Sequence, residues 1–267
     1  DEPASKNPPD GAIVNYYLAK DAQSVTLEVL DAAGKVIRAY KDTDPVERIG
    51  PDYPVPTDWV RPGRALPKSA GMHRWTWDMR HQALSGGGGR GGLPIAAIAH
   101  DTAPVPNSIW AAPGQYRVRL TVDGKAYTQP LTLRMDPRVK TPALGLQQQF
   151  TLSKALYDDI KSAQSAVQQI AAARSQPNSA AFSQRLTELA GQAGFGGRGG
   201  GGGRGAAPAG PDTLNSVSAA LNGLMTTLQG SDTAPTSQIT AAVTERRAAL
   251  VKLLAKWTAL KAEMEKP

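Results

Sequence analysis

Residues 115–135 read Gln115-Tyr116-Arg117-Val118-Arg119-Leu120-Thr121-Val122-Asp123-Gly124-Lys125-Ala126-Tyr127-Thr128-Gln129-Pro130-Leu131-Thr132-Leu133-Arg134-Met135. On both sides of Asp123-Gly124, apolar and polar residues alternate as they do in strands that bury one face. Asp-Gly between two such runs is a strong signal for a two-residue hairpin turn, because both central positions of that turn need positive φ. The stretch therefore predicts an antiparallel hairpin and favours β-structure in the region around it.

The same alternation recurs upstream of the hairpin. In residues 24–30, Val25, Leu27 and Val29 share one face, which is typical of a strand with one buried side. Asp31-Ala32-Ala33-Gly34 predicts the connection of a second hairpin. We expect strands at residues 12–18, 24–30, 35–40, 71–79, 115–122 and 125–135.

The hydrophobic period changes after Pro137. Thr141-Pro142 is typical of a helix N-cap followed by proline at the first helical position. Apolar residues then recur every three or four positions in four segments, which predicts four helices, the second of them short. The apolar stripes comprise Leu146, Phe150, Leu156, Ile160, Ala163, Val167 and Ile170; Phe182, Leu186 and Leu189; Leu214, Val217, Leu221, Leu224 and Leu228; and Ile239, Val243, Leu250, Leu254, Trp257, Leu260 and Met264.

These patterns predict an α+β chain built from two separate modules. Residues 1–137 predict an antiparallel immunoglobulin-like β-sandwich, because no helical pattern separates the strands. Proline-rich and glycine-rich stretches make 41–70 and 81–113 long irregular insertions. Residues 141–267 predict a helical bundle, since each apolar stripe needs a partner to cover it. Within the bundle, 194–210 is a glycine-rich tract that we interpret as a disordered linker.

The charge balance is basic, with 30 Lys and Arg against 23 Asp and Glu and a formal net charge of +7. Such a surplus can indicate a polyanionic partner, but the sequence has no block of positive residues. We interpret it as a solvated basic surface and expect no specific nucleic-acid partner. No apolar run approaches the roughly 20 residues of a membrane-spanning helix, so we expect no membrane span.

The sequence offers no motif for catalysis. It has no cysteine, and the spacing of its three histidines (His73, His81 and His100) is not typical of a metal site. It has no Gly-x-Ser-x-Gly, and Gly86–Gly92 lacks the Lys-Ser/Thr ending of a phosphate-binding loop. We therefore expect no catalytic residue, no metal and no cofactor, and the chain is not predicted to be an enzyme.

Two glycine tracts allow a second interpretation, as RNA-binding segments. Arg90, Arg198 and Arg204 lie in these tracts, and Phe195 is their one aromatic residue. Arginine-glycine segments that contact single strands repeat this unit many times. Flexible spacers are therefore favoured over RNA binding.

Tryptophans supply the remaining candidates for a ligand site. Trp75 and Trp77 share one face of the strand expected at 71–79, where they form either part of the core or a platform for stacking sugars. Trp59 and Trp110 lie in the irregular insertions and are better candidates for ligand contacts at the surface.

Several motifs occur in a fixed order along the chain. They are Asn7-Pro8-Pro9-Asp10-Gly11-Ala12, the stretch 25–38, Gly71-Met72-His73-Arg74-Trp75-Thr76-Trp77-Asp78-Met79-Arg80, the stretch 112–120, Tyr127-Thr128-Gln129-Pro130-Leu131 and Asp136-Pro137-Arg138-Val139. This series resembles the C-terminal region of large secreted bacterial β-propeller proteins with sortilin-like or BNR-type repeats, which are often labelled glycosyl hydrolases. The β part is also similar to the immunoglobulin-like domain of flagellar hook-capping proteins, in which a strand ending in Trp-Asp precedes a Pro-Gly-x-Tyr strand.

The resemblance implies a periplasmic or secreted location. In such proteins catalysis and ligand binding are attributed to the propeller, and this chain contains no propeller blade, so no functional residue is carried over. We expect a non-catalytic structural or protein-interaction accessory region. Its expected partners are the propeller region of the same parent protein, other cell-envelope proteins or polysaccharide. The alternative is a carbohydrate-binding accessory domain of a glycoside hydrolase.

Overall fold

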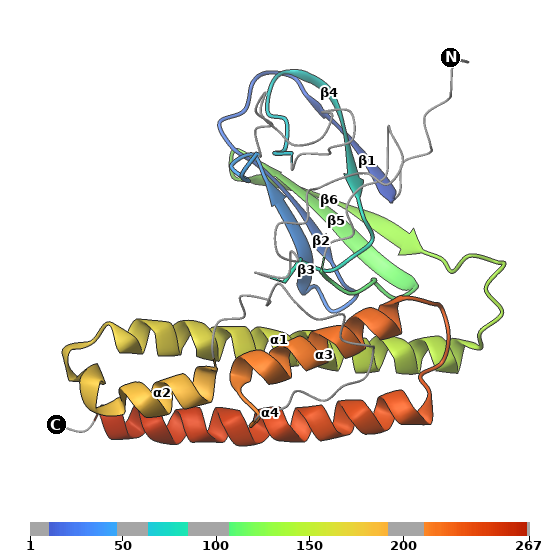
Figure 1. Cartoon of the computed structure of the whole chain (residues 1–267). Coiled ribbons are helices and arrows are strands. Elements are labelled where there is room, and N and C mark those ends of the chain that lie inside the picture. The colour runs from blue at the N-terminus through green and yellow to red at the C-terminus, as the bar shows by residue number, and fades with distance from the viewer. Residues whose placement is uncertain (1–10, 47–63, 85–106, 192–210, 266–267) are drawn as a thin grey trace, which may run out of the picture. The chain divides into compact units, whose positions relative to one another are not determined.

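The computed structural model describes residues 11–46, 64–84, 107–191 and 211–265, and the chain divides into two compact units (Figure 1). The sheet unit, Asp1–Val139, contains antiparallel β-structure, and the helical unit, Lys140–Pro267, contains helices, so the fold class is α+β. The strands are β1 (Ala12–Leu18), β2 (Val25–Leu30), β3 (Val36–Lys41), β4 (Gly71–Trp77), β5 (Gly114–Val122) and β6 (Lys125–Leu133). The helices are α1 (Ala143–Arg174), the 3₁₀ helix η2 (Pro177–Phe182), α2 (Ser183–Ala190), α3 (Leu214–Gln229) and α4 (Ser237–Met264).

The strands form two antiparallel sheets of unequal width. Among the described strands, β1 pairs with β4 alone, and the wider sheet has the order β3-β2-β5-β6. The hairpin predicted at Asp123-Gly124 is confirmed, because Val122 pairs with Lys125 and the two turn residues have φ of 47° and 82°. Pro130 lies in β6, an edge strand, where a missing backbone donor is tolerated.

The core of the sheet unit draws side chains from both sheets. Trp77 is fully buried, and its ring lies 5.7 Å from that of Tyr116 in an edge-on arrangement. Trp75 is 7% exposed and meets Tyr40 in the same way at 5.1 Å. The prediction that both tryptophans belong to the core is confirmed, and a sugar platform built on this pair is wrong. The cluster comprises Tyr16, Leu18, Ala22, Val25, Leu27, Val29, Ile37, Tyr40, Leu66, Trp75, Trp77, Tyr116 and Val118.

The helices of the second unit contact one another, and the sequence placed some of their details wrongly. Thr141 does not cap α1: the helix begins at Ala143, Pro142 occupies the N-cap, and the Thr141 hydroxyl donates to the Asp232 carbonyl. Pro142 has a ψ of 146°, which is extended and not helical, so the helix begins one residue later than expected. Three seam residues were also misassigned. Ala166, Met225 and Leu253 are buried where Val167, Leu224 and Leu254 were expected.

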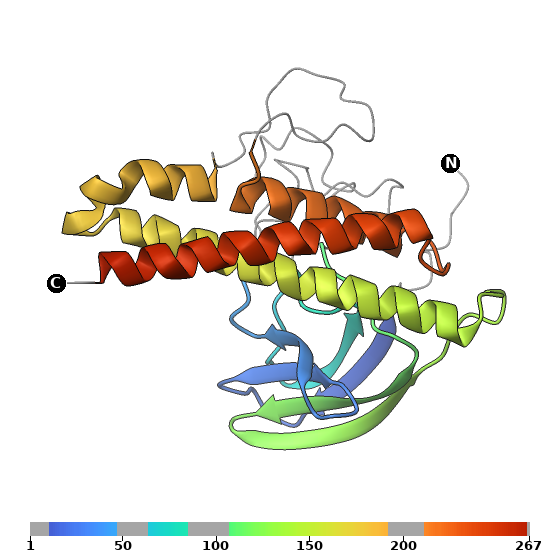
Figure 2. The ribbon, with the colours of Figure 1, turned by 90° about the horizontal axis from the view of Figure 1, so that it is seen from below.

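Helices α2 and α3 follow one another along α1 and α4 (Figure 2). Their facing ends are in contact, since the Asn215 side-chain amide donates to the Gly191 carbonyl at 3.4 Å. A Cβ on Gly191 would lie 2.4 Å from the Thr213 hydroxyl oxygen, so the end of α2 and the start of α3 approach as closely as glycine allows. None of the described helices is both long and apolar enough to cross a membrane.

Candidate functional site

A groove opens at one end of the sheet unit, between β1 and the β5–β6 hairpin. Its volume is about 470 Å³, within the range of small-ligand and peptide sites. One wall is formed by the end of β1 and the start of the β1–β2 connection, and the other by the inward side of the hairpin. The lining residues are Tyr16, Tyr17, Leu18, Ala19, Lys20, Ala22, Leu120, Val122, Asp123 and Tyr127.

The groove exists because the narrow sheet cannot cover the wide one. Residues paired across an antiparallel ladder share a face, so Tyr127 lies on the inward face with Leu120, and Gln129 lies there with Val118. Val118 is buried, whereas Gln129 is exposed and Tyr127 is 49% exposed. The inward face of β6 is therefore open to solvent at the end of the hairpin that carries Tyr127.

Lys20 and Asp123 line the groove, and a second lysine, Lys125, lies beside it. Lys20 is exposed on the β1 side, and the Lys125 ammonium nitrogen lies 5.2 Å from the centre of the Tyr127 ring. The Asp123 carboxylate is already bound, since one of its oxygens accepts from the backbone amides of Gln23 and Ser24 at 2.8 and 2.9 Å. An approaching ligand thus meets two lysines and a carboxylate engaged in holding the loop.

Tyr16 contributes to the floor of the groove as a neutral group. Burial raises the pKa of its hydroxyl to about 12, partly offset by Arg64. The hydroxyl donates to the Pro67 carbonyl at 2.6 Å, and its ring lies 5.0 Å from that of His73. Tyr16 therefore holds the floor of the groove in place, and its hydroxyl stays protonated near neutral pH.

The outer face of the narrow sheet continues the apolar surface beyond the groove. Tyr17 and Met72 lie opposite each other in the β1–β4 ladder and are 66% and 71% exposed. Ile13, four residues before Tyr17 on the same face of β1, is also exposed. Exposed tyrosine and methionine are enriched at protein interfaces relative to the rest of a protein surface.

Trp110, a candidate ligand contact, lies at the base of the segment that follows β4. It is 40% exposed, and the Arg80 guanidinium sits 3.7 Å from its ring centre, so one face of the indole is occupied. Arg80 is itself buried and donates to the Ser108 carbonyl at 3.1 Å. The strand-like pairing of Arg80 with Trp110 was not predicted, because irregular composition hid it. The pairing fixes the Trp110 backbone beside β4.

The other sequence candidates do not join this groove. Trp59, Arg90, Arg198 and Arg204 lie outside the described residues, as do His100 and the tract 194–210. His73 and His81 lie on β4 and after it, and the described residues contain no group of three or more His, Asp or Glu side chains that could hold a metal ion.

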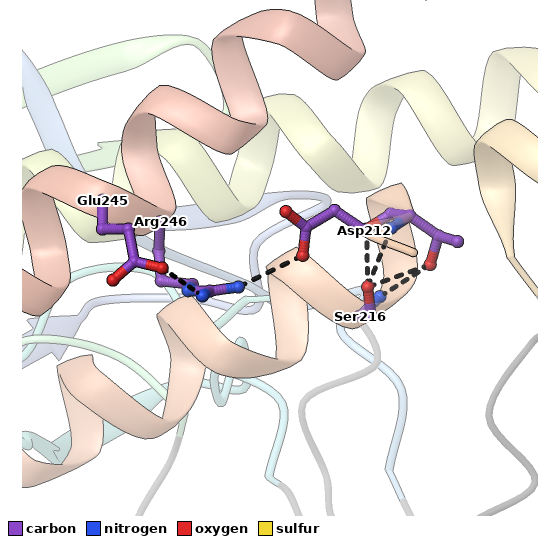
Figure 3. A network of polar contacts seen from close by, with 5 residues as sticks. Asp212, Ser216, Glu245 and Arg246 are labelled. Atoms are coloured by element: carbon purple, nitrogen blue, oxygen red, sulfur yellow. Dashed lines mark hydrogen bonds and ion pairs between the residues drawn. The ribbon is translucent and has the colours of Figure 1, made fainter. Parts of the chain in front are cut away.

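A cluster of charged side chains in the helical unit has a structural role. Figure 3 shows Arg246 of α4 reaching the carboxylates of Glu245 and Asp212, the latter at 3.1 Å. Next to Asp212, Thr213 caps α3: its hydroxyl accepts from the Ser216 amide at 3.1 Å, and the Ser216 hydroxyl accepts from the Thr213 amide at 2.9 Å. The cluster ties the start of α3 to α4.

Sequence reasoning missed Tyr17, Tyr127 and Lys20 as candidates. The alternation does place Tyr17 on the outward face of its strand, which is the one available signal. The exposure of Tyr127 depends on how many strands lie opposite β6, and local patterns do not encode this number.

Comparison with known proteins gives no relative from which a role can be taken. No family model, no curated protein and no solved structure matches the chain. The groove and its neighbouring surface therefore have to be interpreted from their own chemistry.

Proposed function

We propose that this chain is a non-catalytic accessory region of a larger secreted or periplasmic protein, and that it acts by binding another protein surface. The exposed Tyr17–Met72 pair beside the groove carries the proposal. Burying two large apolar side chains of this kind stabilises a complex by about 1.5–3 kcal/mol each at full burial. Without a partner, the two side chains stay in contact with water and this stabilisation is not gained.

The proposed architecture is an immunoglobulin-like sandwich followed by a helical bundle. One core cluster containing residues of both sheets supports the sandwich, as do the edge-on tryptophan contacts across it. The bundle is supported by the spacing of buried residues in α4, which alternates between three and four from Leu250 to Met264. Both modules are scaffolds that host many functions, so the role rests on the surface and not on the fold.

The proposed partner is the propeller region of the same parent protein, or another protein of the cell envelope. A photo-crosslinking residue placed at Tyr17 in the cell that makes the protein tests this. We expect a discrete adduct with one protein, or an internal crosslink to a different part of the parent chain. Val251 is 67% exposed on α4 and provides the matched control position, at which no such adduct should form. Absence of adducts at Tyr17 and Met72 alike would contradict the proposal.

Carbohydrate binding is the second candidate, and the position of Trp110 favours it. Trp110 is 40% exposed, and the Arg80 guanidinium packs on its ring. Sugars stack on a single aromatic face, so such a ring can hold one pyranose. Binding of the chain to cell-wall polysaccharide that is lost in Trp110→Ala, with unchanged melting temperature, would favour this function over protein binding.

A further inference from the structure

The groove wall formed by β1 is a strand edge. A pocket beside one face of a strand touches every second residue, whereas this groove is lined by three consecutive residues of β1, Tyr16, Tyr17 and Leu18, and by the two residues that follow the strand. β1 pairs with β4 on one side, and in the described part of the chain no strand pairs with its other side. The backbone amides and carbonyls of that second edge therefore face the groove.

The opposite wall is shaped to receive the side chains of an added strand. Leu120 and Val122 of β5 are partly buried, and Tyr127 of β6 is half exposed on the same inward face. A strand placed beside β1 would widen the narrow sheet from two strands to three and lie over this face. Alternate side chains of that strand would cover the apolar surface that β1 and β4 leave uncovered.

We propose that the groove binds an extended peptide of a partner protein, which pairs with the free edge of β1 and places apolar side chains against Leu120, Val122 and Tyr127. The proposal rests on the protein-binding function given above and specifies how the partner is held. Backbone pairing supplies the affinity and the inward pockets supply the specificity, as in other cases of strand addition to a sheet edge.

The charge of the rim selects an acidic peptide. Lys20 lines the groove and Lys125 lies over the ring of Tyr127 beside it, whereas the Asp123 carboxylate is engaged by two backbone amides. Lys125 pairs with Val122 and so lies on the inward face; carboxylates at the end of the bound strand nearest the hairpin turn would lie near Lys125 and Lys20 and be favoured by charge. The ligand is thus an extended segment that contains both apolar and acidic residues.

The test uses a capped, fluorescently labelled peptide of alternating valine and glutamate, titrated with the full chain. We expect saturable binding that weakens as salt rises. The first control peptide carries lysine in place of glutamate. The second keeps the sequence but has N-methyl groups on alternate amides, which removes the donors that would pair with β1. Each change should reduce affinity about tenfold or more, since tenfold corresponds to 1.4 kcal/mol and one lost charge-assisted or backbone hydrogen bond is of this size.

Variants of the protein separate specific pairing from attraction to a basic protein. Lys20→Glu with Lys125→Glu should reverse the preference, so that the lysine peptide binds better than the glutamate peptide. Tyr127→Ala should weaken binding of the glutamate peptide severalfold, and Val251→Ala, on α4, should leave it unchanged. Equal binding of the normal and N-methylated peptides, or no binding of either, would overturn strand addition. If adducts at Tyr17 still form in that case, the protein-binding function stands and only its mode is wrong.

Discussion

The sheet unit and the helical unit solve the same burial problem with different results. Each helix of the second unit lies among others that cover its buried stripe, and the described exposed large apolar residues there, Leu144 and Val251, stand alone. In the sheet unit, the described strands form sheets of two and four strands, and large side chains remain exposed on the inward face of the wider sheet (Tyr127) and on the outer face of the narrower one (Tyr17 and Met72). A helix can be oriented so that its apolar stripe packs against a neighbouring helix. The whole apolar face of a sheet is covered only when the layer packed against it is equally wide. The partner surface is therefore expected on the sheet unit.

The two units also differ in how polar side chains join their elements. The helices are linked by exposed ion pairs such as Arg185–Glu263 at 2.6 Å and Arg247–Asp159 at 2.5 Å. Such pairs contribute about 0–1 kcal/mol each. The sheets are linked by buried aromatic contacts, among them that of Trp77 in β4 with Tyr116 in β5 at 5.7 Å. Single substitutions should therefore cost more in the centre of the sheet unit than on the helix surfaces.

Trp77→Ala should have the largest effect on stability. It removes a fully buried side chain, its hydrogen bond and its contact with Tyr116, so the free energy of unfolding of the sheet unit should fall by about 3–5 kcal/mol. Hydrogen exchange of the β2 amides reports this unit, and far-UV circular dichroism reports the helices. If the helix signal and the protection of the β2 amides are lost at the same denaturant concentration, both in the variant and in the natural chain, the two units unfold together.

Leu221→Ala is the matching substitution in the helical unit. Leu221 is fully buried in α3, and its truncation should lower the stability of the helical unit by about 2–5 kcal/mol. Chemical denaturation followed by far-UV circular dichroism measures the change. The neighbouring Leu224 is only partly buried, so Leu224→Ala should cost clearly less. An equal loss of stability at the two positions would contradict the assignment of Met225, and not Leu224, to the buried stripe of α3.

Much of the fold follows from local patterns, as these leucines illustrate. Alternation located all six described strands to within a few residues, since a half-buried strand must alternate. Helical spacing located α3 and α4, but it could not decide between Leu224 and Met225. Both residues fit a stripe with a period near 3.6, and only the direction of the neighbouring helices distinguishes them.

The candidate site depended on information that local patterns lack. Trp110 was selected because it is large and lies in an irregular stretch, and its partial exposure agrees with that choice. The groove was missed because it is made by the end of β1 and the turn of a hairpin about a hundred residues later in the sequence. Long-range pairing and unequal sheet width created it.

Gly191→Ala should have an intermediate effect. Gly191 has φ of 76°, and an added Cβ would lie 2.4 Å from the Thr213 hydroxyl oxygen. Left-handed backbone and the displaced Thr213 cap together should cost the helical unit about 1–3 kcal/mol. Gly223 has open space around its Cβ position within α3, so Gly223→Ala should instead be neutral or stabilising. Thermal melts of the two variants compare these effects directly.

Acid should weaken the sheet unit through Asp42. Its side chain is 7% exposed, and the hydrogen bond from the Lys68 ammonium group at 3.0 Å, helped by the Val25 amide, holds its pKa below the ordinary value. Because the folded pKa is the lower one, the carboxylate stabilises the fold above its ordinary pKa of about 4, and this contribution is lost as pH falls through the lowered value. Asp42→Asn should be less stable at neutral pH and lack this part of the acid-induced loss. Melting temperatures of both proteins across acidic pH measure the difference.

The smallest effect is expected from shortening the connection between α2 and α3. The residues that flank it are already joined, by the Asn215–Gly191 hydrogen bond and the close approach of Thr213. Loop-closure entropy changes by only about 0.6 kcal/mol for each doubling of length, so replacing residues 192–210 by a short glycine-serine bridge should shift helical stability by about 1 kcal/mol or less. The sheet unit offers a matched case, because the Leu84 amide donates to the Asn107 carbonyl at 2.9 Å at the base of residues 85–106. Replacing 85–106 in the same way should be similarly mild. A loss of several kcal/mol in one unit, measured by denaturation, would show that its connection contributes contacts to that unit, and the comparison between the units would then have to include it.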